Sequence, residues 1–203
     1  MPKGTARQMR DKAVFALLSL TGIRVAALVS LRIKHIDLEE KSADQNPREV
    51  ATKFGKLIDT FFVKGFSDAE PALSRWSTHL DEVTPYGPYD PLFPATALKA
   101  KSSAAFQVEG FTRSLWKTTE PVRQIVSTAF ADANLPIHSP HTFRHMLARH
   151  IFKTCTTPAE LVAASQNLGH SDVLTTLRSY GQIGRDRERE LVTVEMRKEG
   201  QCK

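Results

Sequence analysis

The sequence predicts an α+β fold, mostly α-helical with a small antiparallel sheet or hairpin. Apolar residues recur with helical period over much of the chain. A stretch near residues 49–63 instead combines β-branched and aromatic residues with a central glycine, which is typical of a hairpin. The chain has no internal repeat, and 203 residues suit one domain with a sizeable core. We therefore expect residues 1–203 to form a single domain.

Helical patterns dominate the first 83 residues. Residues 6–20 form an amphipathic pattern that predicts a helix ending in a turn at Gly22. A second helix is expected to begin near Arg24. Residues 68–83 also predict a helix, with Pro71 tolerated in its first turn.

The hairpin is expected between these helices. Residues 40–47 are polar and rich in turn formers, which predicts a loop. Two short runs, 49–52 and 58–63, should then pair as strands on either side of a turn that carries Lys53.

The second half of the chain begins with a long connection. Prolines and glycines interrupt the pattern from residue 84 to residue 117, so no regular element is expected there. Helical patterns then resume at residues 120–133, 140–154, 158–168, 171–180 and about 185–198.

The composition excludes several classes of protein. The longest apolar stretch, residues 13–20, is too short to span a bilayer, and the first five residues lack the apolar region of a secretory signal. Two cysteines cannot form a disulfide framework or a four-ligand zinc site. Membrane proteins, secreted disulfide scaffolds and zinc-finger arrays are therefore excluded, and a cytoplasmic domain with reduced cysteines is expected.

Basic charge is concentrated in one part of the sequence. The chain has 28 Lys and Arg against 22 Asp and Glu, a formal charge of +6. No acidic residue occurs between Ala133 and Ala159. Such a balance allows a polyanionic partner, although most surface charges only keep a protein soluble.

His141 and Arg144 form the first candidate site. They lie three residues apart near the expected start of a helix, so they share a face where backbone N–H groups can also bind an anion such as phosphate. The alternative is a surface histidine beside a salt-bridging arginine. A metal site is disfavoured because the motif lacks the glutamate of HExxH and Arg144 would place a positive charge beside the metal. The side chains weighed for that site are His138, His141, His145, His150 and Cys155.

Four further positions are weak signals individually. Gly169 suits a left-handed helix terminus that would present His170 on a rigid corner, but a capping turn with an incidental histidine is the better explanation of this motif taken alone. Tyr180 is either a residue at the edge of the core or a nucleophile whose pKa is lowered by cations. Arg24 follows a tight turn, and Lys53 lies on the expected hairpin.

Taken in order, these residues resemble the catalytic domain of the tyrosine recombinases, the phage integrase family. The resemblance spans residues 10–183, and its context includes Leu92-Phe93-Pro94 in the long connection. It implies the tyrosine recombinase catalytic-domain fold and a site-specific recombinase or integrase that cleaves and rejoins DNA through a covalent 3′-phosphotyrosine. The residues that match the family's motifs are Arg24, Lys53, His141, Arg144, His170 and Tyr180.

The resemblance implies a role for each of these residues. Arg24 and Arg144 would clamp the phosphate, whose developing charge suits two bidentate cations. Tyr180 would attack in line, and Lys53 would protonate the departing 5′ oxygen as general acid.

The two histidines complete the implied chemistry. His141 would assist proton transfer with the tyrosine, and His170 would donate to a phosphate oxygen in the transition state. No metal or nucleotide cofactor is expected. The additional DNA-binding candidates, which would contact phosphates without reading sequence, are Lys56, Arg149 and Lys153.

The expected partner is double-stranded DNA, bound by a homotetramer, with accessory DNA-bending proteins as further candidates. Residues 185–203 would pack on a neighbouring protomer or, equally well, on their own domain. We expect a bacterial or phage-type protein that acts in the cytoplasm.

The chain departs from the family's pattern in two ways. The family commonly has an acidic residue three positions after the first arginine, where it supports the site, and this chain has Ala27. It also starts directly at the catalytic domain, so we expect a fragment or a short member without the N-terminal DNA-binding domain. The functional alternatives are a type IB topoisomerase, which shares the chemistry, and a degenerate homologue that binds DNA without cutting it.

Overall fold

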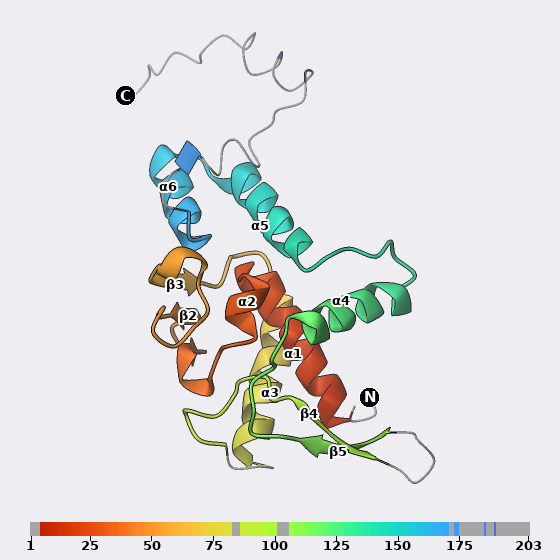
Figure 1. Ribbon diagram of the computed structural model, residues 1–203. Helices are drawn as coiled ribbons and strands as arrows, with labels where there is room; N and C mark the ends of the chain where they lie inside the picture. Colours follow the sequence, from red (N-terminus) through yellow and green to blue (C-terminus); the bar gives the residue numbers. More distant parts are fainter. Residues whose placement is uncertain are drawn as a thin grey trace.

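A computed structural model describes residues 5–82, 86–100, 106–170, 173–174, 185 and 189. Helix α1 (Ala6–Thr21) runs through the middle of the molecule and packs against α3 (Glu70–Glu82), α4 (Glu120–Asp132) and α5 (His141–Thr154) (Figure 1). Helix α6 (Pro158–Asn167) lies beside α5 at one end. The helices expected in these five places are confirmed to within two residues at each end. Those expected at 171–180 and 185–198 fall almost wholly outside the described residues.

The core forms along α1 because its apolar residues recur at helical spacing. Leu17, Leu18 and Leu20 are fully buried, and Phe15 meets Phe143 of α5 edge to face, with 4.7 Å between ring centroids. Thr5 begins the helix with a capping box, in which its hydroxyl accepts from the Gln8 N–H. Burial of this apolar face supplies most of the stability that holds the site's helices together.

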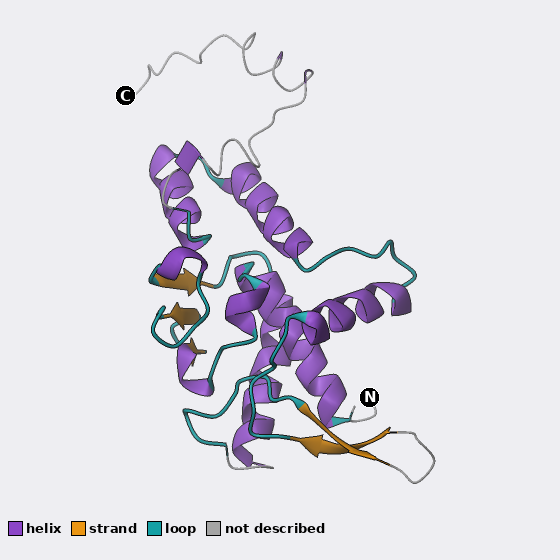
Figure 2. Ribbon diagram, viewed as in Figure 1, coloured by secondary structure: helices purple, strands orange, loops and turns teal. Residues whose placement is uncertain are grey.

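The small sheet is antiparallel, but its strands are not all where the sequence places them. Its order is β1 (Ile36–Asp37), β2 (Ser42–Gln45) and β3 (Ile58–Phe61) (Figure 2). β3 pairs with β2, which lies inside the predicted loop 40–47, whereas residues 49–52 form no strand.

The error has a physical cause. The inward side chain of Gln45 in β2 is polar, and its Nε2 donates to Thr60 Oγ1 over 2.6 Å, so an amide–hydroxyl pair replaces the apolar alternation that sequence patterns detect. Val50, the β-branched residue that suggested a strand, is buried in the helical core instead.

The region between α3 and α4 is also more regular than expected. β4 (Thr96–Ala100) and β5 (Phe106–Phe111) form an antiparallel pair within the predicted connection, at the end of the molecule away from α5 and α6 (Figure 1). A register shift between Ala97 and Leu98 breaks the alternation that would have revealed it.

Short helical turns complete the described part of the chain. The helix expected near Arg24 is a single turn, α2 (Val25–Leu28), and 3-10 turns cover η1 (Ile33–His35), η2 (Lys53–Gly55) and η3 (Ser67–Ala69). Among the described helices, none combines the length and the apolar character that crossing a bilayer requires.

Candidate functional site

The turn between α1 and α2 brings Arg24 to α5. Gly22 ends α1 in the left-handed conformation, with φ of 58°, as the sequence predicts. A Cβ at this position would lie 3.0 Å from Leu147 Cδ1 and 3.3 Å from the Arg144 Cα. Glycine is therefore needed both for the backbone angle and for the close approach. Arg24 follows as the N-cap residue of α2.

Arg144 ties three separate segments together. Its side chain is almost fully buried in α5, where Nη1 donates to the carbonyl of Gly22 over 3.2 Å. Nη2 donates to the carbonyl of Leu168, at the end of α6, and to Nε2 of His170 over 3.0 Å. Because a guanidinium can only donate, His170 Nε2 accepts and the ring proton resides on Nδ1.

The corner after α6 places His170 beside both arginines. Gly169 has φ of 67°, and His170 N–H donates to the Ser165 carbonyl over 3.0 Å, which closes the turn. A Cβ on Gly169 would lie 2.6 Å from Ile58 Cδ1 and 3.4 Å from Arg24 Nη1. The guanidinium of Arg24 therefore lies against this corner. The positive φ of Gly169 confirms the left-handed helix terminus that the sequence predicts.

The electrostatics of the corner keep His170 neutral. Its pKa is lowered to about 4, mainly by burial and then by the positive charges of Arg144, Arg24, Lys56 and Lys53, in that order. Lys53 and Lys56 therefore act on the same site as the two arginines. An uncharged imidazole with its proton on Nδ1 can donate one hydrogen bond at neutral pH.

His141 lies at the exposed start of α5. Partial burial lowers its pKa, and the nearby His145, Arg144 and Arg24 lower it further. Its ring meets that of His145 edge to face, with 4.7 Å between centroids. In its neutral form His141 can accept a proton.

The segment that carries Lys53 is a short 3-10 turn, η2, rather than the expected turn between paired strands, because residues 49–52 form no strand. Lys53 is exposed, and its Nζ lies 4.9 Å from the centroid of the Phe54 ring. Phe54 is itself 81% exposed and has φ of 63°, which is unusual for a residue with a side chain. Lys56 is half-buried nearer the site.

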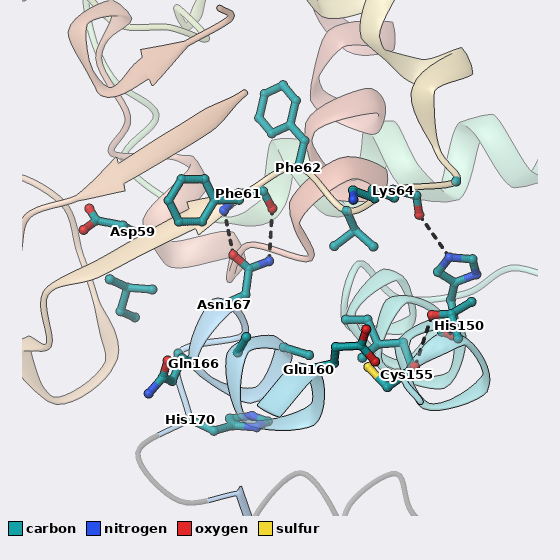
Figure 3. A pocket seen from close by; sticks show the side chains of 18 of the residues that line it. Asp59, Phe61, Phe62, Lys64, His150, Cys155, Glu160, Gln166, Asn167 and His170 are labelled. Carbon is teal, nitrogen blue, oxygen red and sulfur yellow. Dashed lines mark hydrogen bonds between the residues drawn. The ribbon is translucent and has the colours of Figure 1, made fainter. Parts of the chain in front are cut away.

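A groove of about 1180 Å³ begins at the site and runs between β3, α5 and α6 (Figure 3). Lys56, Gly169 and His170 line one end, and the remaining wall is largely apolar. Asn167 joins α6 to β3, because its Oδ1 accepts from the Phe61 N–H over 2.6 Å and its Nδ2 donates to the Phe61 carbonyl over 3.0 Å. Sequence reasoning missed Asn167; its place two residues before Gly169, at the expected end of a helix, was the available signal.

The remaining candidate residues from the sequence do not gather at one place in the structure. Exposed side chains spaced four residues apart form a row along one face of α5, and they are His141, His145, Arg149 and Lys153. His150 instead packs on Phe66 and has Nε2 3.0 Å from the Lys64 carbonyl oxygen. Across residues 5–170 where they are described, and at 173, 174, 185 and 189, no three His, Cys, Asp or Glu side chains gather closely enough to hold a metal ion.

Two positions bear on the completeness of the site. Tyr180, the expected nucleophile, lies outside the described residues. Ala27 is 1% exposed within the core, so the position where the resemblance led us to expect an acidic residue is apolar and buried here.

Comparisons with known proteins agree with this geometry. Residues 2–185 match the model of the phage integrase family. Tyrosine recombinase XerC of Bifidobacterium longum subsp. infantis is 29% identical over 181 residues, which cover 86% of this chain and 44% of XerC. XerD of Listeria monocytogenes is 27% identical over 172 residues, covering 83% and 48% of the two chains. The chain thus spans about half the length of these curated relatives.

Solved structures share the fold. The XerA recombinase aligns with a TM-score of 0.62 and 22% identity, covering 92% of this chain and 56% of XerA. XerH, a site-specific recombinase bound to a palindromic difH substrate in a post-cleavage complex, aligns with a TM-score of 0.64 and 17% identity, covering 96% and 48% of the two chains. The chain is a helical domain with a small antiparallel sheet, and its glycine turns lie beside two arginines. Because the family model also matches residues 2–185, the chain belongs to the phage integrase family.

Proposed function

We propose that the chain is the catalytic part of a site-specific recombinase that cleaves and rejoins DNA through a 3′-phosphotyrosine. The observation that carries the proposal is the convergence of Arg24, Arg144 and His170 from three segments far apart in sequence. Among the described residues, four cations lower the pKa of His170: Arg144, Arg24, Lys56 and Lys53. Such a site suits a phosphodiester, which gains negative charge in the transition state.

In the proposed step, Tyr180 Oη attacks the phosphorus and forms a new P–O bond. The bond from phosphorus to the 5′ oxygen breaks, and Lys53 gives a proton to that oxygen. His141, whose lowered pKa leaves it neutral, takes the proton from Tyr180. The reverse sequence of transfers rejoins the strand.

The arginines and His170 would stabilise the charge. Arg24 and Arg144 supply planar guanidinium groups to the non-bridging oxygens. His170 would donate from Nδ1, since its Nε2 already accepts from Arg144. The positive charge that metal ions supply in other phosphoryl-transfer enzymes would here come from side chains.

The proposed partner is double-stranded DNA in the bacterial cytoplasm. Lys56 and the exposed Arg149 and Lys153 would contact its phosphates and set the register without reading sequence. We expect a homotetramer on two DNA duplexes, with residues 185–203 packing on a neighbouring protomer and accessory DNA-bending proteins assisting.

Covalent capture tests the proposed chemistry. The chain is incubated with a pool of nicked duplexes of randomised sequence, and protein–DNA complexes that resist detergent are isolated and their DNA sequenced. Wild type should be captured and Tyr180→Phe should not, although both should bind the recovered DNA equally, because only the hydroxyl is lost. Tyr89→Phe, at an exposed tyrosine away from the site, is the control.

The alternatives predict other outcomes. Binding without capture by the wild type would indicate a homologue that does not cut DNA. Relaxation of supercoiled plasmid that lacks any captured site would indicate a topoisomerase. Capture of Tyr180→Phe at the wild-type level would remove Tyr180 as the nucleophile.

A further inference from the structure

The segment that leads to Lys53 is held at its base. Val50 is buried in the core, and the carboxylate of Glu49 is held by Lys34 Nζ at 2.7 Å and His35 Nε2 at 2.9 Å. Beyond Lys53 the contacts thin out, since Phe54 and Leu57 are 81% and 66% exposed. The last hydrogen bond that joins this segment to another element before the lysine therefore has the largest effect on where the ammonium group lies.

Among the described residues, the last hydrogen bond that joins this segment to another element is made by Ser30, since the Thr52 N–H that follows donates to the Val50 carbonyl within the segment. The Oγ of Ser30 accepts from the Ala51 N–H over 2.9 Å, two residues before Lys53. The same hydroxyl donates to the carbonyl of Ala27 over 2.8 Å. One side chain thus connects the end of the α2 turn to the lysine segment.

The other end of α2 is Arg24. The Leu28 N–H donates to the Arg24 carbonyl over 2.9 Å, which is the first hydrogen bond of the helix. A continuous path of hydrogen bonds and one helical turn therefore connects the arginine to the lysine, with Ser30 as its only side-chain link. Ala27 contributes no polar group to this path.

We propose that Ser30 is a positioning residue that holds Lys53 in register with Arg24, so that the general acid reaches the oxygen that leaves the clamped phosphate. The inference rests on the proposed function and assigns to Ser30 an effect on proton donation alone. Ser30 and the Ala51 N–H lie at the surface, where water can replace the lost hydrogen bond, so its removal should leave the fold intact.

A sulfur-bridged substrate separates positioning from general damage. A 5′-bridging sulfur leaves without protonation, so a defect in the general acid disappears on this substrate. With DNA recovered by capture, Ser30→Ala should cleave the ordinary duplex about tenfold or more slowly, since misplaced groups lose much of a general acid's effect. It should cleave the sulfur duplex within about twofold of wild type, as should Lys53→Ala.

Two variants control for the hydroxyl itself. Ser30→Thr keeps the hydroxyl and should restore the rate on ordinary DNA. Ser127→Ala removes an exposed hydroxyl that also bonds back to a helix carbonyl, that of Gln124, and should match wild type on both substrates. Hydrogen exchange of the Ala51 amide should accelerate in Ser30→Ala while that of Val50, which is bonded to the Asn46 carbonyl, is unchanged.

The results distinguish failure of this inference from failure of the function. If Ser30→Ala slows both substrates equally, or neither, or leaves Ala51 exchange unchanged, Ser30 does not position the acid. If the wild type forms no covalent complex, or the sulfur fails to rescue Lys53→Ala, the proposed chemistry is wrong, and the role of Ser30 falls with it.

Discussion

Replacing Gly169 by alanine should damage the site more than an ordinary glycine replacement does. An alanine at φ of 67° costs about 1 kcal/mol in backbone conformation. Its Cβ would also lie 2.6 Å from Cδ1 of the buried Ile58, and overpacking of this kind costs about 1–3 kcal/mol. The sum is a loss of about 2–4 kcal/mol of unfolding free energy. Cleavage should fall further, because the same Cβ lies 3.4 Å from Arg24 Nη1.

Gly55→Ala is the matched control. Its φ of 62° carries the same backbone cost, but a Cβ there meets nothing within 4 Å. Urea unfolding should therefore show a loss of only about 1 kcal/mol for this variant. In the Gly169→Ala background, Ile58→Val removes the clashing methyl and should recover about 1 kcal/mol, although Ile58→Val alone costs about 0.5–1.5 kcal/mol.

Equal losses in the two glycine variants would refute the reasoning. So would a double variant whose stability is the simple sum of its parts, since the steric term predicts coupling between Gly169 and Ile58. Covalent capture, normalised to the folded fraction, completes the assay. Gly169→Ala should remain impaired after that correction.

The charges of the site and of the segment beside it lead to four further expectations. Arg24→Lys and Arg144→Lys keep the charge but should each raise the cleavage barrier by about 2–4 kcal/mol, because an ammonium lacks the planar, bidentate donors of a guanidinium. A normal capture rate in either variant would show that the arginine has only a structural role. Hydrogen bonds from Lys34 and then His35 lower the pKa of Glu49 from 4.5 to about 2, so its stabilising effect is complete above pH 4.5 and is lost as pH falls toward 2. Urea titrations should therefore show a smaller acid loss in Glu49→Gln, and equal losses would contradict this. Nitrogen NMR at pH 6 should find His170 neutral with its proton on Nδ1, not charged. Cleavage should survive EDTA, and a metal requirement in that step would overturn the assignment of the cations.

The long helices were predictable because α3, α4 and α5 each bury one face against α1, and α6 packs on α5 and β3. The pattern over residues 6–20, for example, reappears as the buried face of α1. The sheet was harder to predict because β2 satisfies its inward side with a Gln45–Thr60 hydrogen bond rather than with apolar alternation. The β4–β5 pair escaped detection because the prolines that precede it indicate a loop and a register shift masks its period.

The site was predictable as a set of residues but not as a set of contacts. The order of motifs identified Arg24 and Arg144, yet nothing in the spacing shows that Arg144 binds the carbonyls of Gly22 and Leu168. Such contacts depend on how the α1–α2 turn and the α6 corner meet. Asn167 and Ser30 escaped notice because short polar side chains are common at helix ends and in loops.

The cations near His170 link phosphate binding to the stability of the folded chain. Among the described residues, Arg144, Arg24, Lys56 and Lys53 each lower the pKa of His170, and Ala27, three positions after Arg24, contributes no negative charge. A phosphate between Arg24 and Arg144 would offset that repulsion, so its binding should stabilise the folded chain and raise the pKa of His170 from about 4. Both effects should weaken with salt, because phosphate contacts release counterions.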